Sequence, residues 1–297
     1  MNRFPKITIV TPNYNCAEYL EQTIASVLAQ NYPALEYIVI DDGSSDGSAS
    51  IIRRYEDRLA YWRTRPNRGQ YATINEGFER ATGEIMAWLN SDDMYFPGAF
   101  SVVGEIFTQF PEVEWLTTTQ PAAWNEQGQN VGAGNMVGYS KPLFLRGAHG
   151  PARGNYVRGS IQQESTFWRR SLWERAGGHL DTSVTLAADF ELWARFFQHA
   201  ELYGVQSLLG GFRLRKGQNT ERFGREYDQQ CYEVLLRYGG RICGRAESIF
   251  RRYGNQSGLP FLKRFPGAQQ LGLVFAVKSF VHEGRDGSWR LREAVII

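Results

Sequence analysis

Cysteine is scarce in this sequence, and long apolar runs are absent. The three cysteines, Cys16, Cys231 and Cys243, form no Cys-x-x-Cys pair and no Cys/His cluster, which excludes a disulfide framework and a zinc site. No uninterrupted apolar run reaches the about 18 residues that a membrane-spanning helix needs. The first residues lead directly into a strand, without the apolar core of a secretory signal. We therefore expect a cytoplasmic protein.

Several motifs that define common binding sites are also missing. No G-x-G-x-x-G follows the first strand and no G-x-x-x-x-G-K-[ST] occurs, so neither a dinucleotide fingerprint nor a P-loop is supported. No G-x-S-x-G nucleophile elbow is present. The stretch "DDGSSDG" imitates a calcium loop from Asp42 onward, but its twelfth position is Arg53 instead of the closing glutamate. The calcium interpretation therefore fails.

The composition is ordinary, but the charge is unevenly spread. The chain has 297 residues, 42% hydrophobic and 22% charged, with a net charge of +2, typical of a globular protein. Residues 1–212 carry 17 Lys/Arg and 23 Asp/Glu, a net of −6, whereas residues 213–297 carry 16 and 8, a net of +8. Such a basic segment indicates either an acidic partner surface or a solvated helical face.

The first hundred residues alternate between strand and helix patterns. The apolar, β-branched stretches predict strands, and the amphipathic stretches between them predict helices, one with Asn15 as its N-cap. The strands are "KITIV", "LEYIVI", "LAYWRT" and "EIMAWL". This order predicts an α/β fold with a mostly parallel, Rossmann-like sheet flanked by helices. Beyond residue 215, "YDQQCYEVLLRYG", "RAESIFRRYG" and "LGLVFAVKSFVHEG" predict a helical C-terminal extension.

Polar loops follow each of the four strands. They are "TPNYN", "DDGSSDG", "RPNRGQ" and "NSDD", and a parallel sheet brings them to one carboxyl edge, where open α/β folds bind ligands. Asp42 can accept hydrogen bonds from a base or a ribose, and Tyr14 can pack on a base. Arg65 and Arg68 suit phosphate oxygens. Turn formation explains Gly43, Ser44 and Asp46, but explains Asp42 less well, because a turn needs only one carboxylate.

"NSDD" contains two adjacent carboxylates at the end of a buried strand. Asp92 and Asp93 repel each other and lose solvation there. A hydrogen-bonded turn, water or a cation could compensate them. Hard divalent cations are typically shared between one or two carboxylates and a diphosphate, so the convergence of the four loops favours a metal–diphosphate site.

These residues carry a resemblance to a known family. The stretch "TPNYN…DDGSSDGS…NRGQYATINEGFERATGEIMAWLNSDDMYFPGA" resembles the N-terminal half of a family-2 glycosyltransferase with the GT-A fold. A fainter similarity continues through "QQESTFWRRSLWERAGGHLDTSVTLAADFELWARF" to about Arg215. The resemblance implies a glycosyltransferase domain over residues 1–215, with a nucleotide-sugar-binding half (1–119) and an acceptor-binding half (120–215). Residues 216–297 form the extension.

The resemblance implies roles for individual residues. Asp42 matches the aspartate that contacts the base, and Asp92 and Asp93 match the acidic motif that binds the metal. The family usually has Asp-x-Asp there. The first position here is Asn90, a weaker metal ligand that we expect to contact ribose or a metal-bound water. The expected nucleotide-binding residues are Thr11, Pro12, Tyr14, Asp42, Arg68, Asn90 and Ser91.

Asp189 in "ADFELW" occupies the position of the family's catalytic base. From the residues alone it is an acid at a helix start, and an ordinary N-cap aspartate is the alternative. A helix N-terminus lowers the pKa of a carboxyl group, so we expect Asp189 to be ionised at neutral pH. Glu191 is the substitute candidate. Contacts with the diphosphate or the acceptor are expected from Glu191, Gln163, Arg213 and Arg215.

The sequence therefore predicts an inverting, metal-dependent glycosyltransferase. It would move a sugar from a nucleotide-sugar, UDP-linked by expectation, with Mg²⁺ or Mn²⁺, to a saccharide or lipid-linked saccharide held by residues 125–165. The basic extension would contact the cytoplasmic membrane face. A catalytically silent nucleotide-sugar-binding module of a polysaccharide assembly is the alternative, favoured by Asn90. Nucleic-acid binding by the extension is disfavoured by the acidic first domain.

Overall fold

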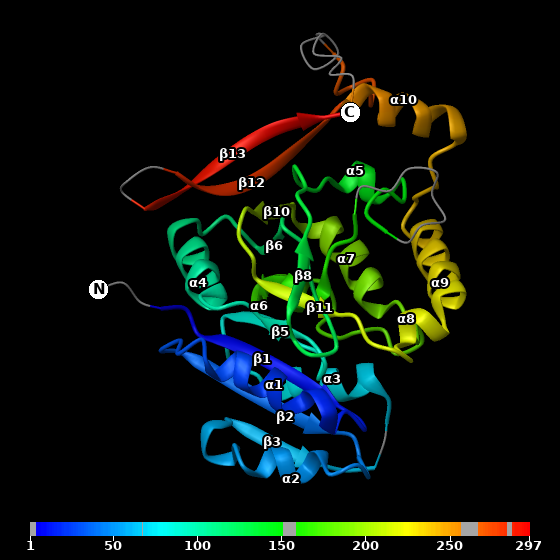
Figure 1. Cartoon of the computed structure of the whole chain (residues 1–297). Coiled ribbons are helices and arrows are strands. Elements are labelled where there is room, and N and C mark those ends of the chain that lie inside the picture. The colour runs from blue at the N-terminus through cyan, green and yellow to red at the C-terminus, as the bar shows by residue number, and fades with distance from the viewer. Residues whose placement is uncertain (1–3, 67, 151–158, 257–266, 284–286) are drawn as a thin grey trace.

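A nine-stranded mixed sheet organises the chain. The computed structural model describes residues 4–66, 68–150, 159–256, 267–283 and 287–297. The strand order is β13-β12-β10-β6-β9-β4-β1-β2-β3, and a smaller sheet has the order β5-β11-β7-β8. In Figure 1 the large sheet extends from β3 at the bottom to the β12–β13 hairpin at the top.

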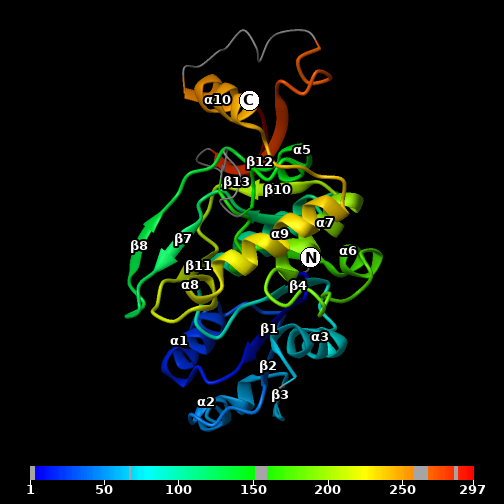
Figure 2. The same cartoon turned by 90° about the vertical axis from the view of Figure 1, so that its right-hand side faces the viewer.

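The strands of the large sheet are β1 (Ile7–Asn13), β2 (Leu35–Asp41), β3 (Tyr61–Thr64), β4 (Ile85–Trp88), β6 (Trp115–Thr118), β9 (Phe167–Arg169), β10 (Leu202–Val205), β12 (Phe275–Glu283) and β13 (Ser288–Ile296). Those of the small sheet are β5 (Met94–Tyr95), β7 (Ala122–Trp124), β8 (Asn130–Ala133) and β11 (Gly210–Arg213). Figure 2 shows β7 and β8 standing beside the main body.

The helices are α1 (Ala17–Leu28), α2 (Ser48–Arg53), η1 (Glu56–Arg58), α3 (Gln70–Arg80), α4 (Ala99–Gln109), α5 (Lys141–Phe144), η2 (Gln163–Ser165), α6 (Arg170–Arg175), α7 (Ala188–His199), α8 (Asn219–Arg222), α9 (Gly224–Arg237) and α10 (Arg245–Gln256).

The predicted parallel core is confirmed. β1 pairs in parallel with β2 and β4, and β2 pairs in parallel with β3. These strands are apolar because helices cover both faces of a parallel sheet; every residue of β1 is buried. β9 enters antiparallel between β4 and β6, so the sheet is mixed. The carboxyl ends of β1, β2, β3 and β4 share one edge, as predicted.

A cluster of tryptophans fixes α7 on the sheet. The Trp193 ring of α7 stacks on Trp88 of β4 at 6.0 Å and on Trp115 of β6 at 5.7 Å between ring centroids. Trp168 of β9 meets Trp193 edge to face at 5.9 Å. Such aromatic pairs contribute about 0.5–1.5 kcal/mol each beyond the area that they bury. The cluster therefore holds the beginning of α7 at a fixed place over the sheet.

Two local predictions are wrong. The stretch 271–284 contains strand β12 instead of a helix, because "FAVKSFV" pairs with β10 and β13. Asn15 is not the N-cap of α1; that position is Cys16, and Asn15 has a left-handed backbone with φ 47°. Its side-chain oxygen instead accepts the Ser45 N–H at 2.8 Å. Asn15 thus joins the first polar loop to the second.

The extension is part of the same architecture. β12 pairs with β10 of the large sheet, and α9 packs against α7. Residues 216–297 therefore contribute strands and a helix to the fold that the sequence assigned to residues 1–215, and the extension is not purely helical. Within the described ranges, no helix is long and apolar enough to cross a membrane.

Candidate active site at the carboxyl edge of the sheet

The first two polar loops meet at the ends of β1 and β2. Asn13 and Asp41 are paired across the two strands. The Asp41 carboxylate accepts hydrogen bonds from Asn13 Nδ2 at 2.8 Å, Ser44 Oγ at 2.5 Å and Thr64 Oγ1 at 2.5 Å. Its partners are the last residues of β1 and β3 and a residue of its own loop, so Asp41 is a structural residue. This explains why the chain has two adjacent carboxylates here: one forms the turn and Asp42 serves another purpose.

Asp42 connects the second loop with the third. Its carboxylate accepts the backbone N–H of Arg68 at 2.9 Å and that of Gly69 at 3.0 Å, and only 3% of the residue is exposed. A carboxylate has about four lone-pair sites, so capacity for a further donor remains. The structure thus brings Asp42 and Arg68 together through the Arg68 backbone, while the Arg68 side chain is exposed.

The other predicted nucleotide-binding residues differ in how exposed they are to solvent. Tyr14 is 52% exposed and free to meet a ligand. Thr11 is fully buried, and its hydroxyl lies 3.1 Å from the Tyr37 hydroxyl, so its side chain is directed into the core. Pro12 is buried as well. The carbonyl of Ser91 accepts the Cys16 thiol at 3.7 Å.

Asn90 links three segments. Its Oδ1 accepts Gln70 Nε2 of α3 at 2.8 Å, and its Nδ2 donates to Gln163 Oε1 of η2 at 3.0 Å. Gln163 in turn donates to the Trp88 carbonyl at 2.6 Å. The amide orientation follows from this network. Asn90 therefore has a structural role that an aspartate would fill less well, since a carboxylate cannot donate to Gln163.

Asp92 and Asp93 are compensated by two arginines of β11 and the loop after it. Arg215 Nε donates to Asp92 Oδ2 at 2.7 Å, and the Arg213 backbone N–H donates to Asp93 Oδ1 at 2.8 Å. Burial, and next the Asp92 charge, raise the pKa of Asp93 well above its usual value. The hydrogen-bonded arrangement that the sequence left open is thus present. Arg213 and Arg215, from which contacts with the diphosphate or the acceptor are expected, both lie against the acidic loop.

The two arginines are themselves rigidly held. Their guanidinium carbons lie 4.9 Å (Arg213) and 5.4 Å (Arg215) from the centroid of the Tyr19 ring. Arg213 is fully buried and donates to the Asp92 carbonyl at 2.5 Å and to Gln22 Oε1 at 2.8 Å. Two guanidinium groups beside an acidic pair form a site suited to a diphosphate.

The acidic pair has the donor chemistry of a divalent-cation site but not a complete ligand set. Carboxylate oxygens are the ligands that Mg²⁺ and Mn²⁺ prefer, and substrate phosphates usually complete the shell. The structure shows no group of three or more acidic, histidine or cysteine side chains suited to a metal in the ranges it describes. Burial, and next the Asp92 charge, raise the pKa of Asp93, and a bound cation would offset both effects.

Asp189 lies on the first turn of α7, where Ala187 is the N-cap. Its Oδ1 is buried and has no hydrogen-bond partner. Burial raises the pKa of Asp189 from 3.8 to about 6, while the N–H groups of Phe190 and of Asp189 itself oppose the rise. The expectation of a lowered pKa is therefore wrong, because desolvation outweighs the helix N-terminus. At neutral pH the group is still mostly ionised.

Glu191, the substitute candidate, is engaged elsewhere. Residues two apart face different sides of a helix. Glu191 forms an ion pair with Arg195 and accepts the Tyr238 hydroxyl at 2.7 Å, and it is 2% exposed. It thus stabilises the packing of α7 on the end of α9, and the structure gives it no place beside Asp189.

Sequence reasoning missed Glu164. This residue of η2 is 3% exposed, and its Oε1 is buried without a partner. Burial raises the pKa of Glu164 to about 8, its own backbone N–H opposes the rise, and the charges of Asp189 and Asp92 add to it. Glu164 is therefore protonated at neutral pH. The available signal was an acid three residues before the apolar start of the predicted strand, at Phe167 and Trp168.

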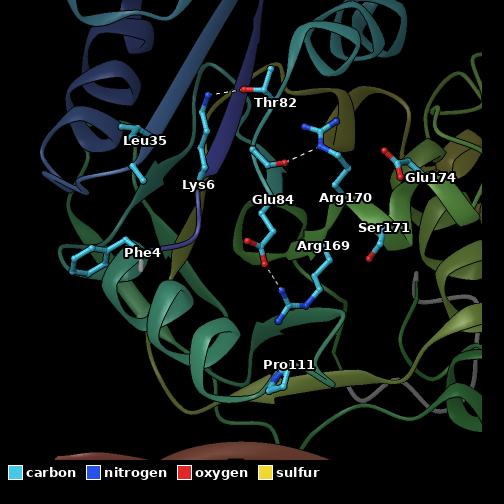
Figure 3. A pocket seen from close by; sticks show the side chains of 12 residues that line it. Phe4, Lys6, Leu35, Thr82, Glu84, Pro111, Arg169, Arg170, Ser171 and Glu174 are labelled. Carbon is cyan, nitrogen blue, oxygen red and sulfur yellow. Dashed lines mark hydrogen bonds and ion pairs between the residues drawn. The ribbon is translucent and has the colours of Figure 1, made fainter. Parts of the chain in front are cut away.

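A groove also exists at the opposite, amino edge of the sheet. Its cavity volume is about 830 Å³, and it is lined by residues that precede β1, β2 and β4 and by the start of α6. Figure 3 shows the side chains that surround it, with Arg169 bonded to Glu84 and Lys6 to Thr82. None of the predicted site residues lines this groove, since they lie at the carboxyl edge.

The expected acceptor region is partly described. Residues 125–150 and 159–165 include β8, α5 and η2, whereas residues 151–158 lie outside the described ranges. Gln163 belongs to the Asn90 network. The β7–β8 hairpin joins the acidic loop through β5 and β11, because Trp124 Nε1 donates to the Met94 carbonyl at 3.2 Å.

Comparisons with known proteins agree with this architecture. Residues 8–118 match the model of the family described as Glycosyl transferase family 2. An uncharacterised glycosyltransferase of Rickettsia typhi is 39% identical over 240 residues, which are 78% of this chain and 70% of that protein. The succinoglycan biosynthesis protein ExoU of Rhizobium meliloti is 26% identical over 261 residues, 83% of this chain and 74% of ExoU.

Solved structures share the fold. The mannosyltransferase PcManGT from Pyrobaculum calidifontis, in complex with GDP-Man and Mn²⁺, has a TM-score of 0.58 at 20% identity, covering 90% of this chain and 74% of that one. S. aureus TarS in complex with UDP has a TM-score of 0.56 at 16% identity, covering 90% and 78%. The α/β sheet and its flanking helices are thus of the GT-A type. The chain is a glycosyltransferase and belongs to glycosyl transferase family 2.

Proposed function

We propose that this protein is an inverting glycosyltransferase that uses a nucleotide-sugar donor and Asp189 as its base. The observation that carries the proposal is the state of Asp189: a partly buried carboxyl with an unpartnered oxygen and a pKa of about 6. A general base works best with a pKa close to the operating pH. A carboxylate with these properties supports proton transfer better than an ordinary N-cap aspartate would.

The donor site comprises the loops at the carboxyl edge. Tyr14 and Asp42 would contact the nucleoside. Arg215 would face the diphosphate, and buried Arg213 would act on it through its charge alone. TarS structures hold UDP or UDP-GlcNAc, and PcManGT holds GDP-Man. We propose a UDP-sugar because TarS carries uridine nucleotides in both of these complexes. A thermal-shift comparison of UDP- and GDP-sugars tests this choice, since a bound ligand stabilises the folded state; a larger shift with GDP-sugars would refute it.

Asp92 and Asp93 would hold Mg²⁺ or Mn²⁺ together with the donor diphosphate. The ion would supply positive charge for the leaving nucleoside diphosphate. The Arg215 guanidinium, now on Asp92, adds charge at the same place. The ion in PcManGT is Mn²⁺. Activity that persists in EDTA would contradict this assignment, and activity lost in EDTA and restored by excess Mn²⁺ would support it.

The transfer step follows from these positions. Asp189 takes the proton of an acceptor hydroxyl as that oxygen forms a bond to the anomeric carbon, and the bond from this carbon to the diphosphate oxygen breaks. The electron pair of that bond leaves with the nucleoside diphosphate, whose charge Arg213 and Arg215 offset. A single displacement inverts the anomeric configuration, by analogy with the water-activating base of inverting glycosidases.

The acceptor is proposed to be a saccharide or a lipid-linked saccharide of a polysaccharide pathway. ExoU and a Bacillus subtilis relative named as a putative teichuronic acid biosynthesis glycosyltransferase support this class. Residues 237–256 contain five arginines and one glutamate, and Ile249 in α10 is 58% exposed. This combination supports contact with an anionic membrane. Sedimentation with anionic but not neutral vesicles is expected, and equal sedimentation with both would contradict it.

Asp189→Asn tests the proposed function, with Glu191→Gln as its matched control on the same helix. Asp189→Asn should abolish transfer and leave donor affinity near normal, because the donor contacts are on other loops. Glu191→Gln should keep turnover, since its partners are Arg195 and Tyr238. Unchanged turnover in Asp189→Asn would refute the base. Detectable hydrolysis of a nucleotide-sugar in the presence of metal would exclude the alternative of a catalytically silent module.

A further inference from the structure

The segment that leads into α7 is held from the donor side of the molecule. Residues 180–187, here called the α7 strap, end two residues before Asp189. The Tyr71 hydroxyl of α3 donates to the Leu186 carbonyl at 2.6 Å. Further back along the strap, the Asn75 amide exchanges two hydrogen bonds with the Leu180 backbone, at 3.0 and 2.7 Å. α3 therefore contacts the strap at both of its ends.

The C-terminal extension holds the same strap from another element. Gln230 of α9 accepts the backbone N–H of Leu186 at 2.9 Å and that of Ala187 at 3.3 Å. Its amide nitrogen donates to Thr185 Oγ1 at 2.9 Å. One side chain thus binds three consecutive residues immediately before α7. The extension, which the sequence described as an appendage, supports the position of the proposed base.

α3 also belongs to the donor side. The helix starts directly after Arg68 and Gly69, whose N–H groups bind Asp42. Gln70, its first residue, donates to Asn90 of the acidic loop. Consecutive residues on a helix point about 100° apart, so Gln70 and Tyr71 reach two different segments from a single turn. That turn sets the distance between the acidic loop and the strap.

Tyr71 is suited to this task. Burial, and next the charge of Asp189, raise the pKa of Tyr71, so the hydroxyl stays a protonated donor over the whole working range. The pKa of Tyr227 on α9 is raised by the same two causes. Both rings therefore lie within the electrostatic reach of Asp189, and only Tyr71 connects that region to the donor loops through its own helix.

We propose that Tyr71 is a positioning residue for the transfer step, fixing through the Leu186 carbonyl where the Asp189 carboxyl lies relative to the donor loops. The proposal rests on the proposed function, in which Asp189 accepts the proton of the acceptor. It assigns Tyr71 no contact with either substrate. It also gives the first turn of α3 a function that the nucleotide-binding motif alone does not require.

Tyr71→Phe tests the proposal because it removes only the hydroxyl. We expect kcat to fall about tenfold, since misplacing a reacting group by about 1 Å can cost up to 10²-fold. The KM of the nucleotide-sugar and the Kd of UDP should stay within twofold, because the Asp42 and Asp92 contacts are retained. Asn75→Ala is the control: it removes two hydrogen bonds to Leu180 of the same strap, so it should lower Tm and keep kcat within twofold.

Three results would overturn the proposal: an unchanged kcat in Tyr71→Phe, an equal loss of kcat in Asn75→Ala, or a raised donor KM with kcat unchanged. If Tyr71→Phe fails to fold, Gln230→Ala replaces it, and the same drop in kcat at constant donor KM is expected. Asp189→Asn distinguishes a failure of the proposed base from a failure of the positioning role alone. Turnover kept in Asp189→Asn refutes the base itself; turnover lost there but normal in Tyr71→Phe refutes only the positioning role.

Discussion

Acidification should stop transfer well above the pH at which an ordinary aspartate is protonated. Burial holds the pKa of Asp189 at about 6 instead of 3.8. The ionised fraction of such a group is about 0.9 at pH 7 and about 0.1 at pH 5, so kcat should fall about tenfold between them. An aspartate with the ordinary pKa would still be more than about 0.9 ionised at pH 5, and the rate would hardly change.

The assay is the initial rate of nucleoside diphosphate release between pH 4.5 and 7.5 at constant ionic strength and saturating donor. Donor binding is measured separately at each pH, because the pKa of Asp93 is also raised by burial and its protonation would weaken the donor site. Glu164→Gln is the control. Burial raises the pKa of Glu164 to about 8, so this carboxyl is already neutral on the acid limb.

Two results would refute the reasoning about Asp189. One is a kcat that stays flat down to pH 5, which would mean that Asp189 is solvated or is not the base. The other is an acid limb that moves in Glu164→Gln, because a group that is neutral throughout that range cannot set the limb. A limb near pH 6 that is unchanged in Glu164→Gln is the expected outcome.

Two further changes test the remaining parts of the site. Arg215→Gln removes the guanidinium that lies 2.7 Å from Asp92 Oδ2. The donor KM should rise at least about tenfold, because a charged hydrogen bond to a diphosphate contributes roughly 1.5–3 kcal/mol. An unchanged donor KM would remove Arg215 from the site. Gly210→Ala puts a methyl group against the Glu164 carbonyl oxygen. Urea denaturation should show a loss of about 1–3 kcal/mol in the free energy of unfolding. An unchanged free energy of unfolding would show that η2 shifts to make room for the methyl group.

The parallel half of the fold was predictable because local patterns and global topology agree there. Each apolar stretch from "KITIV" to "EIMAWL" is a strand, and every loop after it lies at the predicted edge. The misread stretch 271–284 shows the limit. Phe275 and Val277 are buried while Ala276 is exposed, a period of two, but the surrounding apolar residues also fit a helix. Pairing with β10, about 75 residues away in sequence, decides between them.

The site was predictable as a set of loops but not as a set of contacts. Asp92 and Asp93 were identified by their position after a strand, and Arg213 and Arg215 through the resemblance to the family. The role of Asn90 depends on Gln70 and Gln163, which are 20 and 73 residues away in sequence, and no local pattern encodes such a contact. The pKa of Asp189 depends on burial by elements that include α9, which the sequence placed outside the catalytic domain.

The anomeric configuration of the first product, followed by NMR in the wild type and in Asp189→Asn, tests the central claim most directly. The account predicts that an α-linked nucleotide-sugar gives a β-linked product with the wild type and no product with Asp189→Asn, while both bind the donor equally. Retention of configuration, or equal product formation by Asp189→Asn, would contradict single displacement with Asp189 as the base.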